Sequence, residues 1–378
     1  MQKIGIFGGS FNPVHNEHIA MALSAKAELG LNTLYIMPTF IAPHKSAPTL
    51  SAEHRLNMLK LAFKDIDGIE VSDFEIQKGG KSYTYQTVEH FKSNYDCELF
   101  FLVGGDMLYD FKTWKYPERI LSACTLASFS REDFSNDISG LKEYFLTTFN
   151  KDFIQLKTAG KTLSSTKIRV YSSFGLDITK LVPTAVAEYI SKNNLYPADF
   201  YTEAVINTLP EKRIRHTANV VVSALSKCRE LGLDSEKVRI SATLHDIAKY
   251  IDPDSVDGFS KPDDLPPPVV HAFLGEFVAR NSLGITDEEI LEAIKYHTSA
   301  KPQMSDLAKV VFLADMVEED RSYEGVEELR ELFKGDLDDC LLSALKEEVV
   351  HLLNKGKPIY HQTLDAIEYY EKEKIKRG

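Results

Sequence analysis

The pattern of hydrophobic residues changes about halfway along this chain of 378 residues. Up to about residue 196, short apolar runs alternate with helical patterns, which predicts a parallel sheet covered by helices. Beyond residue 200 almost all the patterns are helical. The length also suits two domains better than one. We therefore expect an α/β domain over residues 1–196 and an all-α domain over residues 200–378, with a linker over 194–199.

Six apolar runs in the first half predict strands, and helical patterns lie between them and after them. The strands are expected at Lys3–Phe7, Thr33–Met37, Ile69–Val71, Leu99–Val103, Thr125–Phe129 and Phe153–Gln155. The helices of the first half are expected at Glu17–Leu29, Glu53–Phe63, Tyr85–Tyr95 and Lys180–Asn193. Those of the second half are expected at Glu211–Leu231, Ser235–Lys249, Val269–Arg280, Asp287–His297, Ser305–Glu318 and Leu337–Leu353. This order predicts a Rossmann-like sheet with helices on both faces, followed by a helical bundle.

Charge and cysteine content exclude several classes of protein. The formal net charge of −12 argues against broad electrostatic binding to nucleic acid or to an anionic membrane. No apolar run reaches transmembrane length, and the N-terminal residues lack a signal-peptide pattern. The four cysteines are widely spaced and form no CxxC pair, which indicates neither a thiolate zinc site nor a disulfide framework. We therefore expect a protein of a reducing, cytoplasmic setting, with neither nucleic acid nor membrane as a partner.

The strand expected at Lys3–Phe7 runs directly into a turn and a helix that carry two histidines. Gly8 and Gly9 permit a tight turn and the close approach of a ligand to the backbone. His15 and His18 are three residues apart, so they point to one side of the first helical turn. A helix start with free N–H groups and two imidazoles predicts a phosphate-binding site.

Other groups suited to phosphate follow later in the first half. Lys45 lies in the run PHK, and the run SSTKIR starts a helix whose hydroxyl and N–H groups could hold two phosphates, with Arg169 one turn in. Transfer of an adenylyl group needs an attacking phosphate aligned with the α-phosphate of ATP, and positive charge where negative charge develops. The groups in this half of the chain therefore indicate nucleotidyl transfer.

Five motifs occur in an order that resembles the bacterial nicotinate-nucleotide adenylyltransferases over residues 1–196. They are GGSFNPVHNEH, PHK, SYTY, GGDM followed by Trp114, and SSTKIR. The first motif is shared by many nucleotidyltransferases, while the later ones favour this family over pantetheine-phosphate adenylyltransferases and cytidylyltransferases. Two residues depart from the family pattern: Asn12 stands where Asp is frequent, and Glu17 where Gly is frequent. We expect neither to abolish activity.

The resemblance implies that ATP, with Mg²⁺, reacts with nicotinate mononucleotide to give nicotinate adenine dinucleotide and pyrophosphate. It assigns catalysis to His15, His18, Lys45 and Arg169. It assigns binding of ATP and of the acceptor to Gly8, Gly9, Ser10, Phe11, Thr84, Tyr85, Gly104, Asp106, Trp114, Ser165 and Thr166. On this reading the nicotinate ring stacks on Trp114, and Lys45 meets the mononucleotide phosphate.

The second half carries imidazoles and carboxylates inside apolar helical patterns. They are His216, His245, Asp246, His271, His297 and Asp315. Such groups are costly to bury unless they are paired or bind a metal, so their number predicts one shared metal site. Ligands of this kind without thiolates suit iron, manganese or zinc.

The adjacent pair His245-Asp246 indicates a site with two metals, because one carboxylate can bridge both and the metals can activate a water for attack on phosphorus. The ligands expected on the two sides of the bridge are His216, His245 and Asp315, and His271 and His297. Lys249 and Arg321 are placed to hold substrate phosphate.

The runs LHDIAKYID, IKYHT and LADMVEEDR resemble the HD superfamily of metal-dependent phosphohydrolases, and most of all the YqeK-type HD proteins, over about residues 200–370. The resemblance implies a di-iron centre that splits diadenosine tetraphosphate (Ap4A) into two ADP, with Asp246 and Lys249 in catalytic roles. We expect Glu318-Glu319-Asp320 to form a solvated face without a ligand role, and the segment Asp252–Pro268 to form part of the substrate pocket wall.

Two alternatives stay open for the second half. It could be a regulatory module that binds metal and nucleotide without turnover, although the complete ligand set with Lys249 counts against this. It could also hydrolyse another phosphorylated nucleotide, because HD sites share their ligands and differ in the walls of the pocket.

Overall fold

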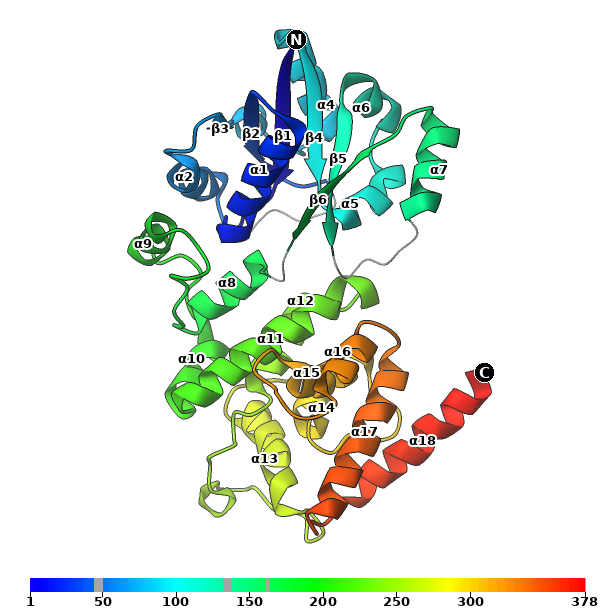
Figure 1. The fold of residues 1–378 in the computed structure, drawn as a ribbon. Coiled ribbons are helices and arrows are strands. Elements are labelled where there is room, and N and C mark those ends of the chain that lie inside the picture. Colours follow the sequence, from blue (N-terminus) through cyan, green and yellow to red (C-terminus); the bar gives the residue numbers. More distant parts are fainter. Residues whose placement is uncertain (44–49, 132–137, 161–162, 378) are drawn as a thin grey trace. The chain divides into compact units, whose positions relative to one another are not determined.

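The computed structural model describes residues 1–43, 50–131, 138–160 and 163–377 (Figure 1). Lys45 therefore lies outside the described residues. Contacts divide the chain into two compact units, each interrupted in sequence. The first unit is Met1–Arg169 with Ile178–Leu195, and the second is Val170–Asp177 with Tyr196–Gly378. None of the described helices has both the length and the apolar character needed to cross a bilayer.

The first unit is built on a sheet of six parallel strands in the order β3-β2-β1-β4-β5-β6. The strands are β1 (Gln2–Gly9), β2 (Thr33–Pro38), β3 (Ile69–Val71), β4 (Cys97–Val103), β5 (Thr125–Arg131) and β6 (Ile154–Gly160). The prediction of a parallel sheet is confirmed, and each of these strands overlaps a predicted one. From β1 the chain adds β2 and β3 on one side, and it then returns to add β4, β5 and β6 on the other side of β1. Folds of this kind bind ligands at such a switch point, here between β1 and β4, beyond the carboxyl ends of the strands.

Helices cover both faces of this sheet (Figure 1). They are α1 (Asn16–Leu29), α2 (Ala52–Phe63), α3 (Phe74–Lys78), α4 (Thr84–Asn94), α5 (Gly105–Tyr109), η1 (Asp110–Thr113), α6 (Pro117–Ala123), α7 (Ile138–Phe149) and α9 (Thr184–Lys192). Helix α8 (Ser165–Ser173) begins in the first unit and ends in the second. The four helices predicted here are present, and α8 begins at Ser165 inside the run SSTKIR, where a helix start was predicted, whereas sequence periodicity missed α7 and the helices of seven residues or fewer.

The described part of the second unit is helical apart from its connections. Its helices are α10 (Phe200–Thr208), α11 (Glu211–Leu231), α12 (Ser235–Leu244), η2 (Pro253–Ser255), α13 (Pro267–Asn281), α14 (Glu288–Tyr296), α15 (Asp306–Val317), α16 (Val326–Phe333), α17 (Leu337–Asn354) and α18 (His361–Arg377). Helix α15 is the centre of the core, because it packs against α11, α12, α14, α16 and α17 and is buried from Leu307 to Ala314. The all-α fold predicted for this half is confirmed.

One predicted boundary in the second unit needs correction. The helix predicted over Ser235–Lys249 ends at Leu244, and the chain turns at His245. The segment Asp252–Pro268 is largely irregular, as predicted, and its Leu265 is buried in a cluster with residues of α13.

Candidate functional sites

The first candidate site begins where β1 ends in a close-packed turn. A Cβ added at Gly8 would lie 3.1 Å from the ring of Phe101, and one at Gly9 would lie 3.0 Å from the ring of Phe11. Phe11 itself is 3% exposed and packs edge-on against Phe7, so its ring belongs to the core beneath the turn. The two predicted glycines are thus needed by the packing, and Phe11 supports the turn from below.

His15 and His18 form a reciprocal cap at the start of α1. Nδ1 of His15 accepts from the backbone N–H of His18 at 3.4 Å, and Nδ1 of His18 accepts from the N–H of His15 at 3.3 Å. The rings stack with centroids 3.6 Å apart. Burial lowers the pKa of His15 to about 4, and burial together with the charge of His15 holds the pKa of His18 well below its usual value. Both imidazoles are therefore neutral at pH 7, with Nδ1 as acceptor and Nε2–H left as donor.

The start of α8 is tied to the loop that follows β1. Ser165 Oγ donates to the carbonyl of Pro13 at 2.8 Å, and Arg169 donates to the carbonyl of Asn12 at 2.8 Å. The same guanidinium donates to Thr166 Oγ1 at 3.1 Å. The structure thus brings the predicted hydroxyls and arginine of α8 to the loop that leads into the histidine pair. Helix N-termini supply free N–H groups for an anion in such a place.

Arg55 is a residue of this site that the sequence analysis missed. It lies on α2 with no exposed surface, and its guanidinium donates to the carbonyls of Ser10 at 2.9 Å and Phe40 at 3.1 Å. The guanidinium therefore fixes the loop after β1 to the loop after β2. An arginine on the same helix face as the buried Met58 and Leu59 was the available signal.

The residues predicted for the acceptor nucleotide lie on α4, on α5 and after η1. Thr84 and Tyr85 start α4, and the guanidinium of Arg119 lies 4.5 Å from the ring centroid of Tyr85. Trp114 caps η1, is half-buried, and packs against Phe111. Tyr85 and Trp114 border the same hydrophobic cluster of the sheet.

Two further predicted residues lie beside β4. The carbonyl of Gly104 accepts from the N–H of Met107 at 3.1 Å. Asp106 lies in α5, and its side chain is outside the described part of the structure.

The second candidate site gathers all six predicted ligands in the second unit. Each comes from a helix or from the turn directly after one: His216 on α11, His245 and Asp246 after α12, His271 on α13, His297 after α14 and Asp315 on α15. Five of them form two groups, within each of which the ligand atoms lie no more than 4.8 Å apart, and the sixth, Asp315, lies outside both groups with Oδ1 3.0 Å from His216 Nε2. The groups are His216, His245 and Asp246, and Asp246, His271 and His297. Asp246 is common to both, as a bridging carboxylate must be.

Helix ends orient two of these imidazoles. His245 Nδ1 lies 2.7 Å from the carbonyl of Ala242, and His297 Nδ1 lies 2.7 Å from the carbonyl of Ile294. Terminal helix carbonyls accept from Nδ1–H, so each Nε2 lone pair faces the cluster. His245 Nε2 is buried and has no hydrogen-bond partner within the described residues, although it lies 3.7 Å from Asp246 Oδ2. A buried nitrogen acceptor that receives no hydrogen bond fits a site that holds a cation.

Electrostatics give three of these groups the protonation states that metal ligands need. Burial lowers the pKa of His245 and of His271 to about 4, so both are neutral at pH 7. Burial acts to raise the pKa of Asp246, but the electrostatic interaction with His245 and the close approach of His271 and His297 outweigh it and hold that pKa well below its usual value. Neutral imidazoles around ionised carboxylates, without thiolates, fit divalent metal ions.

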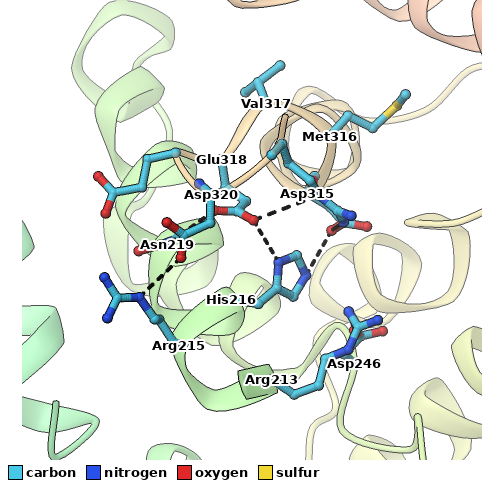
Figure 2. A network of polar contacts seen from close by, with 12 residues as sticks. Arg213, Arg215, His216, Asn219, Asp246, Asp315, Met316, Val317, Glu318 and Asp320 are labelled. Carbon is cyan, nitrogen blue, oxygen red and sulfur yellow. Dashed lines mark hydrogen bonds and ion pairs between the residues drawn. The ribbon is translucent and has the colours of Figure 1, made fainter. Parts of the chain in front are cut away.

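His216 is held between two carboxylates, as Figure 2 shows. Its Nε2 lies 3.0 Å from Asp315 Oδ1, and its Nδ1 lies 3.1 Å from Glu318 Oε1. Glu318 is 2% exposed, so the expectation of a solvated face is wrong for this residue, while Glu319 and Asp320 are exposed. The sequence analysis missed Glu318 because a run of three acidic residues is typical of an exposed surface. The turn after α15 that directs this side chain inward leaves no signal in that run.

Three cations surround the cluster. Lys249 Nζ lies 2.9 Å from His271 Nε2 and 3.4 Å from Asp246 Oδ1. Arg321 donates twice to Asp315, to its carbonyl at 2.8 Å and to Oδ1 at 2.5 Å, so in this structure it braces a ligand. Arg213, which the sequence analysis missed, lies 2.9 Å from Asp246 Oδ2. Its position three residues before His216 on α11 was the available signal.

Comparisons with known proteins agree with this two-part organisation. Residues 6–170 match the Cytidylyltransferase-like family, and residues 213–320 match the HD domain. A Mycoplasma pneumoniae protein named "Probable nicotinate-nucleotide adenylyltransferase/Ap4A hydrolase" is 28% identical over 84% of this chain and 89% of its own length. A Clostridium botulinum protein named "Probable nicotinate-nucleotide adenylyltransferase" is 40% identical over 52% of this chain and 98% of its own length.

A relative from Mycoplasma genitalium, which carries the same name as the Mycoplasma pneumoniae protein, is matched almost from end to end. It is 32% identical over 363 residues, which cover 91% of this chain and 97% of the relative. The chain therefore belongs to the family of these fused nicotinate-nucleotide adenylyltransferase/Ap4A hydrolase proteins.

Proposed function

We propose that the chain is a bifunctional enzyme whose two activities map to residues 1–196 and 200–378. The first half would join ATP and nicotinate mononucleotide into nicotinate adenine dinucleotide, with release of pyrophosphate. The second would hydrolyse Ap4A to two ADP. The observation that carries this proposal is the presence of two separate polar sites, each built from described residues of one unit, in a chain of this family.

In the transferase half, the chain's own groups would align phosphates rather than form covalent bonds. The Nε2–H groups of His15 and His18 would donate to phosphate oxygens of ATP, because both Nδ1 atoms are already occupied as acceptors. Arg169 and the start of α8 would neutralise charge on the leaving pyrophosphate. Lys45 would hold the mononucleotide phosphate, and Trp114 would stack on the nicotinate ring. ATP would enter as its Mg²⁺ complex.

In the hydrolase half, the six clustered ligands would hold two divalent metals, which we propose to be iron, as in the YqeK-type proteins. Bound there, the metals would acidify a water and neutralise phosphate charge. Asp246 would hold its place between the two groups through His271 and His297. Lys249 would move from His271 to a substrate phosphate, because a metal and an ammonium cannot share one Nε2 lone pair.

Single substitutions in the full chain test this division. His18→Ala should reduce nicotinate-dependent pyrophosphate release by about 10²-fold or more and leave Ap4A hydrolysis unchanged. Asp246→Asn should abolish Ap4A hydrolysis, reduce the bound metal and leave pyrophosphate release unchanged. If either substitution abolishes both activities, or if the wild-type chain hydrolyses a panel of other nucleotides but not Ap4A, the proposed pair of reactions is wrong.

A further inference from the structure

Glu318 is a buried carboxylate beside the metal cluster without being in either ligand group. It follows the last residue of α15 and is 2% exposed. Oε1 lies 3.1 Å from His216 Nδ1, and Oε2 accepts from Asn219 Nδ2 at 2.9 Å and from the backbone N–H of Asp320 at 2.7 Å (Figure 2). Burying a carboxylate costs several kcal/mol unless its oxygens are satisfied, so this one has a defined partner for each oxygen.

The location of His216 explains why a side-chain acceptor is present. His245 and His297 follow helix ends, where free backbone carbonyls accept from their Nδ1–H groups. His216 lies inside α11, where the preceding carbonyls are already used by the helix. Its Nδ1–H therefore has to find an acceptor outside its own helix, and Glu318 supplies one.

We propose that Glu318 is a positioning residue of the metal site and that it fixes the tautomer and the ring orientation of His216. This inference rests on the proposed role of the second unit as a metal-dependent hydrolase. An ionised carboxylate only accepts hydrogen bonds, so Nδ1 carries the proton, and in the neutral imidazole that a metal requires Nε2 then presents its lone pair. Nε2 lies 3.0 Å from Asp315 Oδ1, on the side of the first ligand group. A carboxylate acceptor also makes the imidazole a more basic ligand than a carbonyl would.

Neighbouring groups fix Glu318 in turn. Tyr171 OH lies 2.6 Å from Asn219 Oδ1, which directs the amide N–H group of Asn219 toward Glu318. The guanidinium of Arg330 donates to the carbonyls of Val317 and Glu318 at 2.9 and 2.7 Å and so holds the turn after α15. The carboxylate is thus held from α11 on one side and from its own turn on the other, as an orienting residue requires.

The second ligand group, Asp246, His271 and His297, serves as a comparison within the same molecule. Asp246, His271 and His297 make no contact with Glu318 among the interactions of the described residues. Removing the carboxylate should therefore lower the affinity for one metal ion and leave the affinity for the other unchanged. If Glu318 had a merely structural role, both affinities would fall together or neither would change.

The test uses the full chain, stripped of metal by a chelator and titrated with Mn²⁺ in a calorimeter. Glu318→Gln keeps the shape and removes the charge, and Asp320→Asn is the matched control, because Asp320 is exposed and pairs with Arg215 at the surface. We expect Glu318→Gln to lower the affinity for one of two Mn²⁺ ions by about 10–100-fold, while the affinity for the second ion and the rate of pyrophosphate release stay unchanged. Ap4A hydrolysis should return at saturating Mn²⁺, and Asp320→Asn should bind both ions like the wild type.

Equal weakening of both ions, or unchanged binding of both, would overturn the positioning role. If Glu318→Gln does not fold, Asn219→Ser carries the same test, and it should weaken the same ion by a smaller factor because it frees only Oε2. Since the titration needs no substrate, it is independent of the proposed reaction. A wild-type chain that binds two ions without cleaving Ap4A would overturn the proposed function, whereas selective weakening in Glu318→Gln would still support the positioning role.

Discussion

Replacing Arg55 by methionine should loosen the loop that leads from β1 into the histidine pair. The guanidinium donates to the carbonyls of Ser10 and Phe40, and hydrogen bonds to charged groups contribute about 1.5–3 kcal/mol each, so the two are worth roughly 3–6 kcal/mol. Methionine also removes the desolvation penalty of a fully buried cation, which offsets several kcal/mol. We expect a net loss of about 2–3 kcal/mol, which for a unit of this size lowers Tm by roughly 4–12 °C.

Differential scanning calorimetry of the full chain measures this loss of stability. The unfolding transition of the first unit is identified as the one whose Tm rises when ATP is added, because a ligand stabilises the unit that binds it. Nicotinate-dependent pyrophosphate release should fall as well, because Ser10 and the residues after it lose one of their two guanidinium supports. The Tm and the activity of Arg55→Lys should lie between those of the wild type and Arg55→Met, since one ammonium group cannot reproduce the two hydrogen bonds of the planar guanidinium. Lys142→Met is the matched control, because Lys142 is partly exposed and pairs with Asp152 at the surface of the same unit. An Arg55→Met chain with wild-type Tm and activity would refute the reasoning.

Three further outcomes are expected. Gly9→Ala should cost about 1–3 kcal/mol in the first unit, since its Cβ would lie 3.0 Å from the ring of Phe11; Gly335→Ala, whose Cβ meets nothing closer than 3.5 Å, should leave Tm unchanged. Burial lowers the pKa of His15 from 6.5 to about 4, so the unfolded chain binds a proton between these values that the folded chain does not. Stability should therefore fall by about 3 kcal/mol as the pH drops through that window, and urea unfolding of His15→Asn should show a flatter dependence. Lys249→Met should reduce Ap4A hydrolysis by about 10²-fold while the chain still binds two metals, and a loss of metal would contradict its proposed contact with phosphate.

The sequence predicted the fold well where hydrophobic periodicity is long and regular. Five of the six strands and the helix Glu211–Leu231 were predicted close to their observed bounds, because buried strands and long amphipathic helices leave a clear pattern, whereas the prediction for β6 covers only its first two residues. Helices α3, α5 and α6 were missed, since five to seven residues are too few for a period of 3.6 to stand out. Their positions are set by the packing around them instead.

The candidate sites show the same division. The six metal-ligand candidates were predicted because buried imidazoles and carboxylates are unusual in an apolar pattern, and the structure places five of them in two overlapping groups with Asp315 beside His216. The residues that orient them were not, because a supporting role depends on a spatial neighbour. Glu318 stands in a charged run that reads as surface, and Arg55 and Arg213 act through groups 45 and 33 positions away along the chain.

Helix α8 makes the helical unit discontinuous in sequence order. Val170–Asp177 belong to that unit although they precede the last segment of the sheet unit, Ile178–Leu195. A separately expressed fragment that starts at residue 200 would therefore lack a piece of its own core and would lose the Tyr171 hydroxyl from the buried Asn219. Cutting the polypeptide at the predicted linker therefore removes residues 170–177 from the helical unit. A fragment of the hydrolase half has to be designed with these residues supplied, by circular permutation or as an added peptide.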